Sequence, residues 1–116
     1  MMLRNTVLAL VLLLGWAGGA TAQEQMRLFK IVSSKDEVVI GLTQAELQKL
    51  GAGPELDRLA KHLAAEGQMT VWQYAVRKDA AGNLQQAPLR RIAVFRNDTL
   101  RIEPYTTPLA VVAPVP

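Results

Sequence analysis

Cysteine is absent from all 116 residues of this chain. Its absence excludes a disulfide framework, a thiol nucleophile and a thiolate metal site. A lipid-anchored export signal is excluded as well, because that signal needs a cysteine at its cleavage point. The folded chain must therefore be held together by its hydrophobic core alone.

Histidine and serine are nearly as scarce, which leaves little material for catalysis. His62 is the only histidine, and the only serines are Ser33 and Ser34. The helical pattern places His62 on a solvated flank beside Glu66, one turn further on. The sequence contains neither a phosphate-binding glycine loop nor a spaced set of metal ligands. We therefore predict a protein that is not an enzyme and that holds no cofactor and no metal, with a hydrolase using His62 as a minor alternative.

The first 22 residues predict export. Arg4 precedes an apolar run over residues 6–14, and small residues then lead to Ala-Thr-Ala at positions 20–22. This pattern is typical of a secretory signal peptide. The apolar run is shorter than the roughly 20 residues that span a bilayer. We expect cleavage between Ala22 and Gln23 and a periplasmic or secreted mature protein, whose only membrane contact would be an uncleaved leader.

The mature chain is small and almost neutral. Removal of 22 residues leaves 94, with 12 Lys and Arg against 10 Asp and Glu and a net charge of +2. This length fits one small domain, which we place at residues 23–103. So slight a positive balance does not favour binding to nucleic acid or to an acidic membrane. A helix-turn-helix over residues 43–63 is also disfavoured, because Glu55 and Asp57 would face DNA phosphates.

The apolar pattern predicts an α+β fold in the order ββ-αα-βββ. Strands are expected over residues 27–33, 37–42, 69–77, 90–96 and 99–103, with a short edge at 84–87 that Pro88 interrupts. Residues 92–95 form an unbroken apolar run, which is typical of a strand covered on both sides. A hairpin of the last two strands would bring Arg96 close to Arg101. We expect a mostly antiparallel sheet of about five strands with two short helices on one face.

Two helices are predicted between the second and third strands. Thr43 and Glu46 have the spacing of a capping box, and Leu42 and Leu47 stand at the staple positions around it. Gly51 ends this first helix. The second helix is expected to begin at residue 54, a proline, and to end at residue 67, a glycine.

The last segment, residues 104–116, differs in composition from the rest. It carries no charge and holds four of the six prolines. That density of proline predicts an extended tail without regular strand pairing. Three alternatives remain open at this point: a disordered end, a strap along the domain's own surface, or a segment that binds a partner.

The leading functional hypothesis is a non-catalytic periplasmic domain that acts through contact with another, unidentified periplasmic protein. The expected contact groups are in the tail, and an exposed sheet edge is a second possible surface. The tail residues are Tyr105, Leu109, Val111 and Val112. The alternative hypothesis is a module that binds a small ligand or an anion through the basic C-terminal strands. Its candidate residues are Arg90, Arg91, Arg96 and Arg101.

Overall fold

The computed structural model describes residues 25–115, so the predicted signal peptide and its cleavage site at Ala22 and Gln23 lie outside the described residues. The elements, in order, are β1 (Met26–Val32), β2 (Glu37–Thr43), α2 (Gln44–Lys49), α3 (Glu55–Glu66), β3 (Gln68–Lys78), β4 (Leu84–Phe95), β5 (Arg101–Pro104) and β6 (Ala110–Val111). The predicted α+β class is confirmed, with two short helices and a mostly antiparallel sheet.

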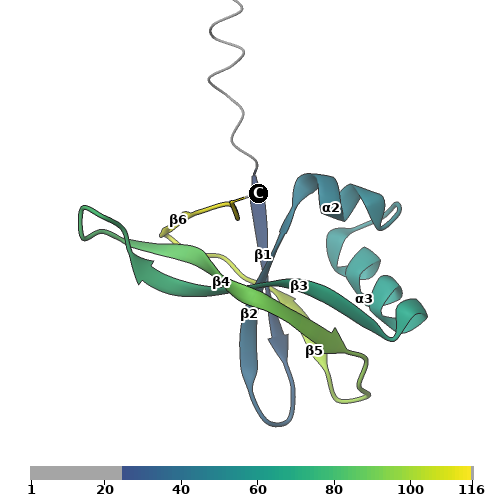
Figure 1. Cartoon of the computed structure of the whole chain (residues 1–116). Coiled ribbons are helices and arrows are strands. Elements are labelled where there is room, and N and C mark those ends of the chain that lie inside the picture. Colours follow the sequence, from purple (N-terminus) through teal and green to yellow (C-terminus); the bar gives the residue numbers. More distant parts are fainter. Residues whose placement is uncertain (1–24, 116) are drawn as a thin grey trace, which may run out of the picture.

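The sheet has six strands in the order β5-β1-β2-β3-β4-β6 rather than about five. Every neighbouring pair is antiparallel except β4 with β6, which is parallel. The hairpin that would have brought Arg96 close to Arg101 does not form, because β5 pairs with β1 and not with β4. Leu100 and Ile102 explain this placement, since both pack against the main hydrophobic core. In Figure 1 the β1–β2 and β3–β4 hairpins cross, and α2 and α3 lie together on one side.

Strand β4 is continuous where the sequence predicted a break at Pro88. The pairing register with β3 shifts between Gln73 and Tyr74, which leaves Leu89 as the extra residue of a β-bulge. A proline is tolerated in a strand at a position where the missing N–H would point away from the neighbouring strand. The expectation that residues 92–95 are covered on both sides is also wrong, because Phe95 is 61% exposed.

The main core lies between the helices and one face of the sheet. The predicted capping box is present: the Glu46 N–H donates to the Thr43 hydroxyl over 3.0 Å, and the Thr43 N–H donates to the Glu46 carboxylate over 2.8 Å. Helix α3 ends at Gly67, whose φ of 81° is easily adopted by glycine. The buried core residues are Phe29, Ile31, Ile40, Leu42, Leu47, Leu59, Leu63, Met69, Val71 and Val94.

The opposite face of the sheet is covered in part by residues 105–115, which we call the C-terminal strap. The Tyr105 N–H donates to the Leu28 carbonyl over 3.0 Å, and the Val112 N–H donates to the Gln86 carbonyl over 2.9 Å. The Tyr74 hydroxyl donates to the Val112 carbonyl over 2.6 Å. Of the three alternatives for the tail, the structure shows a strap that lies along the domain's own surface.

Strand pairing inside the strap was not expected from its proline content. Ala110 and Val111 pair with Gln85 and Gln86 of β4, so the expectation is wrong for these two residues. The physical reason is the position of the prolines, which stand at residues 104, 108, 114 and 116. Residues 110–112 therefore keep the N–H groups that pairing requires.

A second, smaller group of buried residues lies on the strap side. Leu28 and Tyr74 are 7% and 3% exposed, and neither belongs to the main core. The Tyr74 ring lies against Gly41, where an added Cβ would come within 2.4 Å of the Tyr74 Cε1 atom. A side chain at this position of β2 would clash with the Tyr74 ring, so glycine is favoured here.

Candidate functional site

The first two of the four candidate arginines, Arg90 and Arg91, are adjacent on β4 and point to opposite faces of the sheet. The Arg90 Nε atom donates to the Gln73 side-chain oxygen over 3.1 Å. The Arg91 guanidinium lies over the ring of Trp72, 5.6 Å from its centroid. Both side chains are exposed to solvent.

The other two arginines have separate partners. Arg96 donates to the Ala64 carbonyl near the end of α3 over 2.7 Å, which satisfies one free carbonyl of the last helical turn. Arg101 forms an ion pair of 3.1 Å with Glu103 on β5. The structure therefore brings Arg90, Arg91 and Arg96 to one strand and its end, with Arg101 elsewhere, and the four do not line a common pocket.

The candidate tail residues contact the protein's own sheet. Val112 bonds to Gln86 and Tyr74, and Val111 belongs to β6. The ring of Tyr105 lies 5.8 Å from the Lys30 ammonium nitrogen. Leu109 is half-buried. All four residues are partly buried, so part of each side chain still faces solvent.

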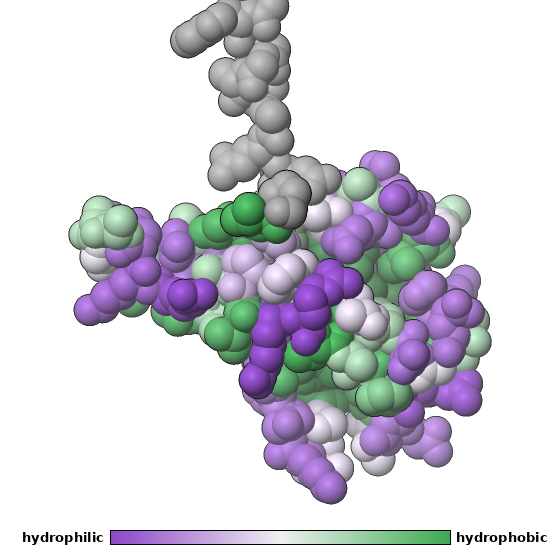
Figure 2. Space-filling model, viewed as in Figure 1, coloured by the Kyte–Doolittle hydropathy of each residue, from purple (hydrophilic) through white to green (hydrophobic). Residues whose placement is uncertain are grey.

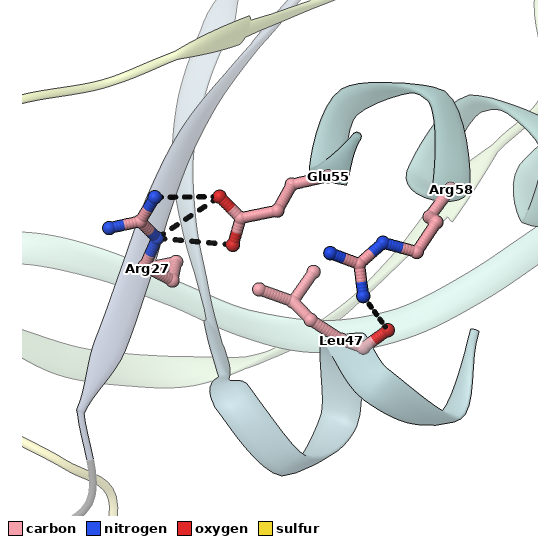
Figure 3. Close-up of polar contacts among 4 residues, drawn as sticks. All are labelled: Arg27, Leu47, Glu55 and Arg58. Carbon is pink, nitrogen blue, oxygen red and sulfur yellow. Dashed lines mark hydrogen bonds and ion pairs between the residues drawn. The ribbon is translucent and has the colours of Figure 1, made fainter. Parts of the chain in front are cut away.

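An ion pair that the sequence did not predict connects β1 to α3. Arg27 and Glu55 form a two-pronged contact, with a shortest distance of 2.7 Å between Nη2 and Oε1 (Figure 3). The hydrogen bond to Glu55 and the charge of Glu55 raise the pKa of Arg27. Arg58 of α3 donates to the Leu47 carbonyl of α2 over 3.0 Å. The ion pair joins α3 to β1, and the Arg58 hydrogen bond joins α3 to α2. Arg27 and Glu55 are 28 residues apart, so no local sequence pattern could predict their contact.

The outer edge of β4 is a second surface that the sequence did not locate. Within residues 25–115, β6 pairs with β4 only at Gln85 and Gln86, so residues 89–95 have no strand neighbour on that side. We call residues 89–95 the open edge. Leu89 is 45% exposed and Phe95 is 61% exposed. In Figure 2, hydrophilic and hydrophobic surfaces lie next to each other where β4 crosses the centre of the molecule.

The direction of the backbone groups on the open edge follows from the pairing with β3. The Arg96 N–H donates to the Gly67 carbonyl, and residues of an antiparallel strand alternate in the side to which they bond. Ile92 and Val94 therefore bond towards β3, opposite Val71 and Met69. The N–H and C=O groups of residues 91, 93 and 95 point away from the sheet, free to bond to another strand.

A shallow groove of about 340 Å³ adjoins the open edge. Ile92 and Val94 form one wall, and Ile31 and Val38 of the β1–β2 hairpin form the other. Leu100 and Asp36 also line it. The groove thus has a mixed lining, with apolar side chains on both walls, Ser33 and Gln73 among its polar residues, Arg90 on the wall formed by β4 and the Asp36 carboxylate on the opposite wall.

The residues considered for catalysis are not assembled into a site. The Ser33 hydroxyl donates to Asp36 in the turn between β1 and β2. His62 lines a separate depression beside Glu46 and Met69. Within residues 25–115 no three His, Asp or Glu side chains are close enough to hold a metal ion. The helices of the same region are too short and too polar to cross a bilayer.

Comparisons of the chain with protein-family models, curated proteins and solved structures find no match. The geometry of the described residues is therefore the basis for a functional proposal.

Proposed function

We propose that this chain is an exported, non-catalytic domain that binds another protein by adding a strand to the open edge of β4. The observation that carries the proposal is the edge itself: within residues 25–115 no strand pairs with the outer side of residues 89–95, and the backbone groups of residues 91, 93 and 95 point outward. Such an edge is a template for an extended segment of another chain.

The side chains of the open edge support the same proposal. Leu89 and Phe95 are large apolar residues that remain exposed, and a partner strand would remove both from water. The edge of β4 already accepts one strand, because β6 pairs with it at Gln85 and Gln86. The backbone of β4 is thus suited to strand addition along its outer side.

The C-terminal strap has a different role in this proposal. Its residues Val111 and Val112 are engaged with β4 and Tyr74, so the strap closes one half of the β4 edge and leaves the other half free. Export rests on the leader in residues 1–22, and it would place the open edge in the periplasm or outside the cell.

The alternative of an anion-binding module receives less support. Arg90 and Arg91 point to opposite faces, and Arg96 and Arg101 have their own partners. An anion site needs donors that converge on one point. The arginines are better placed to act along a strand than around a small ligand.

Site-specific photocrosslinking in living cells tests the proposal. A photoreactive phenylalanine analogue replaces Phe95 on the open edge, and the matched control carries it at Gln48, an exposed position of α2. We expect a discrete protein adduct from position 95 that is absent from position 48. The adduct should disappear in the Ala93→Pro background, since proline removes an outward N–H without breaking a bond to β3. Equal adducts at both positions, or adducts insensitive to Ala93→Pro, would contradict the proposal.

A further inference from the structure

We infer that the segment which pairs with the open edge is extended and acidic, an inference that rests on the proposed function. Arg90, Arg91 and Arg96 lie on β4 or directly after it, and none makes an ion pair with the described residues. The three ion pairs of residues 25–115 instead use Arg27, Lys30 and Arg101. A strand laid along β4 would bring its own side chains beside these guanidinium groups, whose hydrogen-bond partners among the described residues are neutral.

The positions of the two strand arginines define where carboxylates are preferred. Arg90 faces the groove side and Arg91 faces the side of Trp72, so a strand beside them presents alternate residues to each. A Glu or Asp opposite either arginine forms a cross-strand pair of opposite charge. Asp36 lies on the far wall of the groove and disfavours a second carboxylate there.

The remaining positions of the ligand are expected to be apolar. Residues opposite Ile92 and Val94 would enter the groove that Ile31 and Leu100 also line. Residues on the other side would lie beside Ala93 and Phe95, both exposed. The favoured ligand is therefore an extended segment with apolar residues and at least one carboxylate near Arg90 and Arg91.

A second copy of this chain is a poorer occupant of the same edge. Pairing of two β4 edges would collect Arg90, Arg91 and Arg96 of both copies at one interface. Like charges at short distance across a sheet oppose pairing. Charges and bulges at an edge are also a common protection against self-association. The same arginines attract an acidic strand, so they select the partner rather than close the edge.

The test uses mature protein, residues 23–116, and three blocked peptides that alternate valine with glutamate, lysine or serine. Binding of a labelled peptide is followed by fluorescence anisotropy. We expect the glutamate peptide to bind roughly tenfold more tightly than the serine peptide and the lysine peptide to bind least. The affinity of the glutamate peptide should fall as the ionic strength rises from about 0.01 M to about 0.1 M, because the Debye length shortens from about 30 to about 10 Å.

Two variants distinguish the effect of the arginine charges from the effect of backbone pairing at the open edge. Arg90→Glu with Arg91→Glu should reverse the preference, so that the lysine peptide binds more tightly than the glutamate peptide. Ala93→Pro should abolish binding of both, and Ala93→Ser is its control. Circular dichroism and melting temperature establish that each variant is folded.

The outcomes distinguish the acidic nature of the ligand from strand addition to the open edge. Equal binding of the three peptides, abolished by Ala93→Pro, would overturn the acidic ligand and leave strand addition standing. Binding that persists in Ala93→Pro, or an absence of binding by every peptide, would also overturn the inference. In that case the photocrosslink at position 95 decides whether the proposed function falls with it. A charge preference that reverses in the arginine variant supports the inference.

Discussion

At the residue scale, Tyr74 and Gly41 determine how closely the strap side of the sheet can pack. The Tyr74 ring is 3% exposed, rests on Gly41, and its hydroxyl is bonded to the Val112 carbonyl. Burial is the main cause that raises the pKa of Tyr74 to about 12, and the negative charge of Glu46 adds to it. Both residues could be read from the sequence as strand residues, but their contact could not, because it depends on the register of β2 and β3.

The substitution Gly41→Ala should destabilise the protein by about 1–3 kcal/mol, the usual cost of overpacking. The new methyl group would lie 2.4 Å from the Tyr74 Cε1 atom, so the ring must move. Urea unfolding followed by Trp72 fluorescence measures the loss. In a Tyr74→Ala background the same substitution should cost much less. An equal cost in both backgrounds would show that the ring is not the cause.

Tyr74→Phe should lower the free energy of unfolding by about 1 kcal/mol, because the Val112 carbonyl loses its donor. The phenol titrates at about 10 when unfolded and at about 12 when folded, so the folded state favours its protonated form. The contribution is complete below pH 10 and is lost as the pH rises through 12. Urea unfolding of both proteins between pH 9 and pH 12 should therefore show their difference in stability shrink. A difference that is constant with pH would contradict this account.

At the element scale, local signals predicted the helices well and the later strands less well. The capping box at Thr43 and the end of α3 at Gly67 are confirmed, and α3 begins at Glu55, one residue after the predicted start at Pro54, because each of these features depends on neighbouring residues. Strand β4 was expected to break at Pro88, and the bulge at Leu89 shows how the strand continues. The partner of β5 could not be predicted, because it depends on how the chain crosses the sheet after β4, which no local pattern encodes.

Thr43→Ala should destabilise the protein by about 1 kcal/mol, since the Glu46 N–H loses its acceptor at the start of α2. Glu46→Gln is the matched control, because glutamine can also complete a capping box. Thermal unfolding of the three proteins measures the effect. An equal loss from both substitutions would indicate that the charge of Glu46, rather than the cap, stabilises this helix.

At the scale of the whole molecule, the sheet is covered by helices on one face and by the strap on part of the other. The sequence predicted the α+β class, the order of most elements and the extended form of the C-terminal segment. It did not predict β6, the Arg27–Glu55 pair or the open edge, since all three arise from contacts between distant segments. For the same reason the four arginines could be chosen as candidates but not placed relative to one another.

Truncation after Glu103 should lower the free energy of unfolding by roughly 2–4 kcal/mol, because Leu28 and Tyr74 lose their cover. Truncation after Val112 keeps the bonds to Gln86 and Tyr74 and should stay close to the wild type. Urea unfolding measures the loss of stability, and binding of a hydrophobic dye measures the apolar surface that each truncation exposes. If the protein truncated after Glu103 were as stable as the protein truncated after Val112, the strap would contribute little to the stability of the fold.

Hydrogen exchange by NMR on the free mature protein tests most directly whether the edge of β4 is open. The amides of Arg91, Ala93 and Phe95 should exchange rapidly, while those of Ile92, Val94 and Arg96, which bond towards β3, should be protected. This alternation is expected if no other strand is paired with the open edge. Protection of all six amides would mean that another segment or another copy already covers the edge, and that result would contradict the account.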